Sequence, residues 1–359
     1  MKFRAFDLKL AHRWTISTGL RPGGSGGTNL YPVVFVELAD ETGIQGIGEA
    51  APSTRYEGGV QSTIEFLRRV DPQRLSFSDI PASMDYLNSL GGQHFAGKGA
   101  INIALLDGAA RRVGKPICDH LGLGFTEGKH ISSFSIGIDS PEMIRQKVLE
   151  AASYPVLKLK VGSPQDRLNL AALREAAPQK PIRVDANEAW KTKEEALQQI
   201  EWLASDGAIQ FIEQPMPAST DPKDLAWLKS QTPLPIMADE SCRSVQEIAL
   251  CAECYHAVNV KLMKTSGING AYETLTAARK AGLKTMIGCM IESSVLITAA
   301  AHLAELADYL DIDGNLLITN DPFLGVTAEG GVISFAQAPG QAGLRVKARA
   351  PVDREHPGT

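Results

Sequence analysis

Acidic residues follow three consecutive hydrophobic segments of the chain. Asp185 ends the segment Pro-Ile-Arg-Val-Asp, Glu213 ends Ile-Gln-Phe-Ile-Glu, and Asp239 ends Pro-Ile-Met-Ala-Asp. A single acid at such a place is explained by capping of the helix that follows. Three carboxylates brought together from three strands would repel one another unless a cation lay between them, and hard oxygen ligands suit Mg²⁺. The sequence therefore predicts one Mg²⁺ site made by these three residues.

Two lysines stand two positions apart in the run Leu-Lys-Leu-Lys that ends at Lys160. On a β-strand, Lys158 and Lys160 point to the same face. Their mutual repulsion and partial burial are expected to lower the pKa of at least one of them, and a lysine that is neutral part of the time can act as a base. The alternative is a solvated edge strand. The flanking Val156 and Val161 favour a core strand instead.

Two further pairs of charged residues occur later in the chain. Lys261 ends the segment Ala-Val-Asn-Val-Lys, and Lys264 follows three residues later. We prefer Lys261 as a second base because it is a strand-end residue, whereas Lys264 falls in a loop. Asp311 and Asp313 repeat the two-residue spacing with acids. Two carboxylates that face one pocket are expected to hold a cationic group such as a substrate ammonium, and the alternative is a surface turn.

The elements that must position these residues alternate regularly between residues 130 and 314. Their ends at 160, 185, 213, 239 and 261 are separated by a nearly constant step, which is the length of one strand, one helix and two short loops. Eight such units close into a (β/α)₈ TIM barrel, whose strand ends face one common pocket. Strands are expected at 131–136, 156–161, 181–185, 209–213, 235–239, 257–261, 285–289 and 309–313, with helices that include 140–152, 193–204 and 267–281.

The remainder of the chain predicts an α+β capping domain. We expect three regions: an N-terminal domain over 1–125, the barrel over 126–314, and a C-terminal segment over 315–359 that returns to the cap. Alternation predicts strands at 1–14 and 32–39, and helical patterns lie near 60–70 and 100–113. The glycine-rich stretch 19–29 is too long for a tight hairpin turn and is expected to be a mobile flap. Short β-like segments at 331–335 and 344–346 complete the tail.

The composition excludes several classes of protein. The chain has 36 Lys and Arg against 41 Asp and Glu and no basic run, so no nucleic-acid partner is expected. It has no apolar stretch long enough to span a membrane. The alternating start lacks the apolar core of a signal peptide, and five cysteines without regular spacing suit a reducing compartment, so we expect a cytoplasmic protein. The lone pair Cys251 and Cys254 is interpreted as helical rather than as a zinc site.

The order of these motifs resembles that of the enolase superfamily, muconate-lactonizing-enzyme subgroup. The shared motifs are Lys-x-Lys at 158–160, Asp-x-Asn at 185–187, Glu-Gln-Pro at 213–215, Asp-Glu-Ser at 239–241 and Lys-x-x-Lys at 261–264. With Gly-Cys-Met-Ile-Glu-Ser-Ser at 288–294 and Asp-Ile-Asp at 311–313, the chain is similar to dipeptide epimerases of the L-Ala-D/L-Glu type.

The resemblance implies a role for each residue singled out above. Asp185, Glu213 and Asp239 would bind one Mg²⁺ per active site, and Lys160 and Lys261 would be the two acid/base residues. The implied substrate-binding residues are Lys158, which would polarise the substrate carboxylate, Asp311 and Asp313, which would hold the substrate amine, and Ser135, Cys289, Met290 and Glu292, which would line the pocket.

Specificity is left open by the sequence. The flap would close over the substrate side chain, and either Arg21 within it or Arg55 near it would pair with an acidic side chain such as glutamate. The alternative is that each arginine is a solvated surface residue. The resemblance further implies a homo-oligomer and a place in peptidoglycan peptide metabolism.

The implied reaction is a two-base 1,1-proton transfer through an enediolate, which inverts the C-terminal residue of a dipeptide. The alternatives within the subgroup are an N-acylamino-acid racemase, an o-succinylbenzoate synthase and a cycloisomerase. Their substrates have no free amine and do not need Asp311 and Asp313. A non-catalytic binding barrel is the remaining alternative, but it would have no reason to keep two opposed lysines around a metal site.

Overall fold

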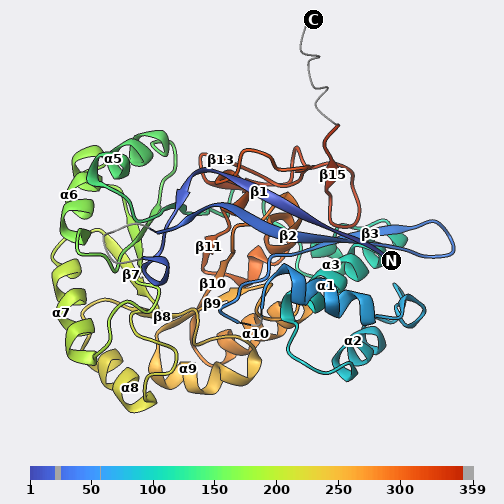
Figure 1. Cartoon of the computed structure of the whole chain (residues 1–359), viewed down its shortest axis with the longest axis horizontal. Coiled ribbons are helices and arrows are strands. Elements are labelled where there is room, and N and C mark those ends of the chain that lie inside the picture. The colour runs from blue at the N-terminus through green and yellow to red at the C-terminus, as the bar shows by residue number, and fades with distance from the viewer. Residues whose placement is uncertain (21–25, 57, 351–359) are drawn as a thin grey trace, which may run out of the picture.

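Eight parallel strands form the largest sheet of this computed structural model, which describes residues 1–20, 26–56 and 58–350 (Figure 1). Each strand pairs with the next one along the chain, and a parallel bridge between Ser132 and Leu310 joins the first edge of the sheet to the last. The predicted barrel is therefore confirmed. Its strands are β4 (Phe134–Ile136), β5 (Leu157–Lys160), β6 (Ile182–Asp185), β7 (Ile209–Glu213), β8 (Ile236–Ala238), β9 (Ala257–Lys261), β10 (Lys284–Gly288) and β11 (Tyr309–Asp311).

Polar side chains begin several of the helices around the barrel. Ser140, Thr192, Asp221 and Ser293 each accept a hydrogen bond from a backbone N–H of the first turn. These caps satisfy donors that the helix itself cannot, and they fix where each helix starts. The helical segments are α5 (Pro141–Glu150), α6 (Asp166–Ala176), α7 (Lys193–Ala204), α8 (Pro222–Gln231), η3 (Val245–Glu247), α9 (Ile248–Cys254), α10 (Ile268–Lys280), α11 (Ser294–Ala301) and η4 (Ala304–Leu306).

The N-terminal region pairs a three-stranded antiparallel sheet with helices. Helix α3 approaches the sheet closely at Gly46 and Gly48, where a Cβ atom would lie 2.0 Å and 1.9 Å from the carbonyl oxygens of Ala104 and Ala100. Only glycine allows this contact. The elements are β1 (Lys2–Trp14), η1 (Ser17–Gly19), β2 (Thr28–Ala39), β3 (Gln45–Ala50), α1 (Val60–Arg69), η2 (Pro72–Arg74), α2 (Ile80–Ser89), α3 (Phe95–Arg112) and α4 (Ile117–His120). Strand β3 and helix α2 were not predicted, and α3 begins earlier than expected.

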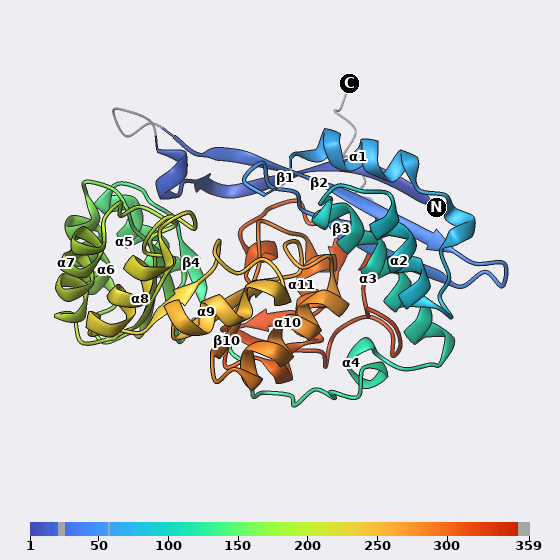
Figure 2. The ribbon, with the colours of Figure 1, turned by 90° about the horizontal axis from the view of Figure 1, so that it is seen from below.

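One end of the long ribbon of β1 and β2 lies over the barrel, and helices α1–α3 lie at its other end (Figure 2). The Ser17 hydroxyl donates to the carbonyl oxygens of Ala186 and Asn187, at 2.9 Å and 2.8 Å, and so ties the end of this ribbon to the loop after β6. Glu49 of β3 accepts hydrogen bonds from the backbone and side chain of Ser293, at the start of α11. The cap is thus held at two places on the same end of the barrel.

The C-terminal segment contacts both regions. Thr319 donates its N–H to the carbonyl of Lys9 in β1 at 2.8 Å, and Ser132 donates to the carbonyl of Gly331 at 2.8 Å beside the barrel. Its elements are η5 (Gly314–Leu316), β12 (Phe323–Leu324), β13 (Thr327–Glu329), β14 (Val332–Ser334) and β15 (Lys347–Ala348). Strand β14 falls within the expected segment 331–335, whereas the second expected segment, 344–346, lies just before β15.

No helix within residues 1–20, 26–56 and 58–350 has the length and apolar character that crossing a membrane requires.

Candidate active site

A cavity of about 400 Å³ lies between the cap and the strand ends of the barrel. Side chains from β5, β9 and β11 line its floor, and side chains from β1, β2 and the loop after β3 line the opposite side. The predicted residues that line the cavity are Lys158, Lys160, Lys261, Asp311 and Asp313, together with Ser135, Cys289 and Met290. Residues far apart in the sequence thus meet where the barrel geometry predicts.

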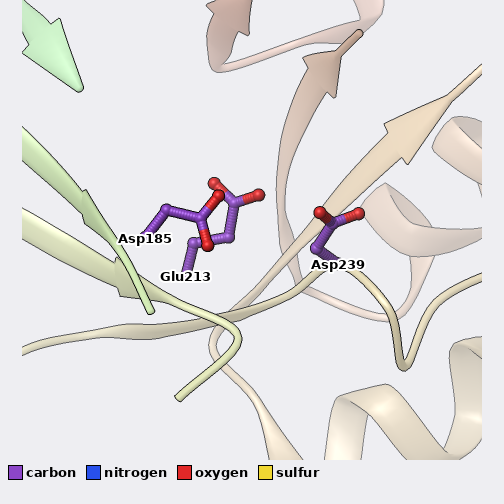
Figure 3. Close-up of side chains that lie close together, drawn as sticks. All are labelled: Asp185, Glu213 and Asp239. Atoms are coloured by element: carbon purple, nitrogen blue, oxygen red, sulfur yellow. The ribbon is translucent and has the colours of Figure 1, made fainter. Parts of the chain in front are cut away.

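The three predicted metal ligands converge on one space (Figure 3). One carboxylate oxygen from each of Asp185, Glu213 and Asp239 lies within 4.8 Å of the other two, and all three side chains are buried. Burial and the charge of Asp185 raise the pKa of Glu213 to about 7, which reflects the cost of crowding acids in a dry site. Three buried hard oxygen donors in this arrangement fit a divalent cation of the Mg²⁺ type.

Lys158 connects the carboxylates of three strands. Its Nζ lies 3.0 Å from Asp185, 2.7 Å from Glu213 and 2.7 Å from Asp311. Burial by itself lowers the pKa of Lys158, but the three carboxylates outweigh burial and hold the pKa well above its ordinary value. The lowered pKa that was expected for at least one of the two lysines is therefore not found at Lys158. Repulsion from Lys160 is a smaller effect than three close attractions.

Lys160 and Lys261 contact the acidic cluster from opposite sides of the barrel. Lys160 Nζ lies 2.6 Å from Asp185 Oδ2, and Lys261 Nζ lies 2.8 Å from Asp239 Oδ2. Their strands, β5 and β9, are four positions apart in an eight-stranded ring, so the two amines face each other across it. The competing Lys264 is fully buried and bonds the carboxylate and carbonyl oxygens of Asp239, which suits a structural role.

Asp311 and Asp313 are buried, so the alternative of a surface turn does not hold. Asp311 Oδ1 accepts a hydrogen bond from Ser133 Oγ at 2.6 Å, and Asp313 Oδ2 accepts one from the backbone N–H of Ser135 at 2.6 Å. Strand β11 ends at Asp311, yet Asp313 also faces the cavity. Burial and the charge of Asp311 raise the pKa of Asp313 to about 7.

The remaining predicted residues lie at different depths. Glu292 is buried behind the cavity wall, and its carboxylate accepts the backbone N–H of Met290 at 2.9 Å. Arg21 lies outside the described residues. Arg55 lines the cavity but forms an ion pair with Glu188, and its Nε lies 3.9 Å from Glu240. The Arg55 guanidinium is thus paired within the protein, and its pairing with an acidic substrate side chain stays a prediction.

Several cavity residues were missed by sequence reasoning. The indole of Trp14, at the end of β1, lies 5.9 Å from Lys160 Nζ, and Tyr56 lines the cavity beside Arg55. Burial raises the pKa of the Tyr56 phenol, and the nearby charge of Asp239 adds to this. An aromatic residue that ends an alternating strand was the available signal for Trp14. For Tyr56 the available signal was its position next to Arg55 in the sequence.

Gln214, within the Glu-Gln-Pro motif, was also missed. Its side-chain oxygen accepts the backbone N–H groups of Asp239 and Ser241, at 2.9 Å and 3.1 Å. Its amide group donates to the carbonyl of Met216 at 2.8 Å. Gln214 therefore connects the loop after β7 to the loop after β8, and it fixes the backbone that carries Asp239.

Comparison with known proteins gives consistent matches over nearly the whole chain. Residues 142–341 match the family described as enolase C-terminal domain-like, and residues 25–122 match the mandelate racemase / muconate lactonizing enzyme N-terminal domain. A Pedosphaera parvula protein named L-Ala-D/L-amino acid epimerase is 62% identical over 349 residues, which cover 97% of this chain and 99% of that protein. An L-Ala-D/L-Glu epimerase of Bacteroides thetaiotaomicron is 36% identical and covers 96% of this chain and 88% of that protein.

A solved structure gives the same picture. The dipeptide epimerase of Enterococcus faecalis, complexed with Mg and L-Leu-L-Tyr, is 30% identical to this chain and matches it with a TM-score of 0.85. The match covers 96% of this chain and 98% of that one. The similarity therefore extends over both the cap and the barrel.

Proposed function

This chain belongs to the enolase superfamily, in the mandelate racemase / muconate lactonizing enzyme group, and we propose that it is a Mg²⁺-dependent dipeptide epimerase. In the proposed reaction the α-carbon of the second residue of a dipeptide changes configuration. No bond other than the α-C–H bond is broken and remade. The enzyme is an isomerase that acts on a small peptide.

The observation that carries this proposal is the placement of two amines on opposite sides of the acidic cluster. Lys160 and Lys261 contact different carboxylates of the cluster, Asp185 and Asp239, from strands that face each other. A substrate carboxylate near the cluster would place its α-carbon between the two amines. One lysine can then remove a proton from one face while the other returns a proton to the opposite face.

The stabilisation of negative charge makes the proton transfer feasible. An α-proton beside a carboxylate is a very weak acid because its removal adds a second negative charge. Asp185, Glu213 and Asp239 would hold Mg²⁺, which would supply positive charge where this second charge develops. Lys158 lies within hydrogen-bond distance of Glu213 and is held protonated, so its ammonium group can donate to a substrate carboxylate oxygen.

The two acids at the end of the eighth strand favour a dipeptide over other substrates of the subgroup. Asp311 and Asp313 present two buried carboxylates to the cavity, and only Asp311 is paired with a lysine. The α-ammonium of a substrate would supply a positively charged partner for Asp313. N-acylated amino acids and cycloisomerase substrates have no such group. The epimerase names of the Pedosphaera parvula and Bacteroides thetaiotaomicron relatives agree with this interpretation.

The proposal is tested by incubating the protein with Mg²⁺ and a library of dipeptides in D₂O and following the masses and configurations of the products. An epimerase adds one deuterium to the second residue and produces both epimers. We expect this result for dipeptides with a free amine and an L-residue first. If only N-acylated amino acids exchange, the protein is an acylamino-acid racemase, and if no compound exchanges, the catalytic proposal is wrong.

A further inference from the structure

Two buried oxygen atoms beside the acidic cluster have no hydrogen-bond partner. These atoms are Asn187 Oδ1 and Glu240 Oε2, in residues that are 4% and 5% exposed. Both residues line the cavity. An unpaired buried acceptor destabilises the folded protein, so a fold keeps one at a functional site when a ligand satisfies it.

The two residues are held together and beside the metal ligands. The amide of Asn187 donates to Glu240 Oε1 at 3.3 Å, and the backbone N–H of Asn187 donates to Asp185 Oδ1 at 2.9 Å. Glu240 directly follows Asp239. Asn187 has φ of 42° and the next residue, Glu188, has φ of 66°, so two successive residues adopt the left-handed conformation. This strained backbone, fixed also by Ser17, aims the Asn187 side chain at the site.

Other unpartnered atoms near the cluster have an explanation that these two lack. Glu213 Oε2 lies 2.7 Å from the ammonium of Lys158. Asn259 Oδ1 packs against Gly288, where an added Cβ atom would lie only 2.4 Å away. Asn187 Oδ1 and Glu240 Oε2 have no such explanation, since the nearby cation, Arg55, lies 3.9 Å from the other carboxylate oxygen of Glu240, Oε1. Both atoms are buried acceptors in residues that line the cavity, next to the predicted cation site.

We propose that Asn187 and Glu240 are positioning residues that accept hydrogen bonds from water molecules bound to the divalent cation. The inference rests on the proposed function, because it requires the cation at the acidic cluster. Mg²⁺ seeks six ligands and keeps several waters when a protein offers only a few carboxylates. A metal-bound water is a strong donor, and the two buried acceptors have the chemistry to accept hydrogen bonds from it.

Metal affinity in the absence of substrate tests this inference. The variant Asn187→Gly removes the carboxamide and tolerates the left-handed backbone. Glu240→Met removes both carboxylate oxygens with little change in size, and Glu240→Gln removes the charge but keeps one acceptor. We expect Asn187→Gly and Glu240→Met to weaken Mg²⁺ binding by about 10- to 100-fold in calorimetric titrations, and Glu240→Gln to weaken it less.

A matched control is available elsewhere in the barrel. Asn169 in α6 is buried and has unpartnered side-chain atoms, but it is not among the residues that line the cavity. Asn169→Leu should leave Mg²⁺ affinity at the level of the parent protein. With Mn²⁺ bound, the relaxation rate of water protons should change in Asn187→Gly and Glu240→Met and not in this control, because the exchange of metal-bound water is altered.

The outcomes separate this inference from the proposed function. If Asn187→Gly and Glu240→Met bind Mg²⁺ as the parent does, the inference is wrong, even when the parent epimerises dipeptides. If these variants keep Mg²⁺ affinity and lose only substrate affinity, the oxygens contact substrate rather than metal-bound water, and the inference is again wrong. If they lose Mg²⁺ affinity while the parent does not exchange any dipeptide, the inference holds and the proposed function fails.

Discussion

The two sides of the cavity differ in kind. The barrel side carries a connected set of charges, in which lysines of β5 and β9 contact acids of β6, β7, β11 and the loop after β8. The cap side presents aromatic and small residues, among them Trp14, Tyr31, Tyr56 and Gly27. Among the described cap residues that line the cavity, Arg55 carries the charged side chain, and it is already paired with Glu188.

This difference separates two tasks. Groups that move protons and hold a cation must keep fixed positions, and barrel strands in a parallel sheet provide them. The side chain of the second substrate residue is not touched by the chemistry, so its contacts can come from the cap. We therefore expect variants on the barrel side to change catalysis strongly. Variants on the cap side should change substrate preference or stability.

The largest expected effect follows from removing one metal ligand. Asp239→Asn should weaken Mg²⁺ binding and lower epimerase activity by more than about 1,000-fold, because charge stabilisation is lost where the second negative charge forms. Calorimetry and rate measurements check both effects. Asp308→Asn is the matched control, since Asp308 pairs with Lys284 at the other end of the barrel strands and should leave both quantities unchanged. Full activity in Asp239→Asn would refute the metal site.

A smaller effect is expected at the amine-binding acids. Asp313→Asn should raise the KM for dipeptides roughly 100-fold, because a charge-assisted hydrogen bond to the ammonium is lost. Asp313 is the cleaner target, since Asp311 also holds Lys158. N-acetylated dipeptides serve as the control, because they lack the ammonium and should bind poorly to parent and variant alike. An unchanged KM would favour an acylamino-acid racemase.

The attachment of the C-terminal segment and α4 should affect stability rather than chemistry. His302 is buried, its Nδ1 accepts the N–H of Cys118, and its Nε2 donates to the carbonyl of Leu344. Burial lowers the pKa of His302 from 6.5 to about 4. Because the folded pKa is depressed, the stabilisation is full above pH 6.5 and is lost as the pH falls toward 4.

The expected loss from His302 is about 3 kcal/mol over that range. Urea unfolding of the parent and of His302→Gln at several pH values measures it. The parent should lose more stability than the variant between pH 6.5 and 4, since glutamine does not titrate. Equal losses in the two proteins would show that other groups govern acid sensitivity.

The smallest expected effect lies on the cap. Arg55→Ala removes an ion pair in which the arginine side chain is 35% exposed, and such pairs contribute about 1 kcal/mol or less. We expect the kcat for dipeptides with apolar second residues to stay within a few-fold of the parent. A selective loss for dipeptides that end in glutamate would instead show that Arg55 leaves Glu188 to bind acidic side chains, and it would assign specificity to the cap.

The same contrast explains what the sequence could and could not predict. The two-residue period of strands and the regular step between strand ends are enough to predict that Lys160, Asp185 and Glu213 lie at one end of the barrel. The partner of Arg55 and the position of Tyr56 depend on how the cap docks, and no local pattern encodes that. The raised pKa of Lys158 could not be predicted for a similar reason, because acids from three other strands set it.

The most direct test of the central claim is α-proton exchange by Lys160→Ala and Lys261→Ala in D₂O, measured separately with each epimer of one dipeptide. Two bases on opposite sides predict that neither variant interconverts the epimers. Each variant should still exchange the α-proton of a single epimer, and the two variants should differ in which epimer that is. Full epimerisation by Lys261→Ala, or exchange of the same epimer by both variants, would contradict the two-base account.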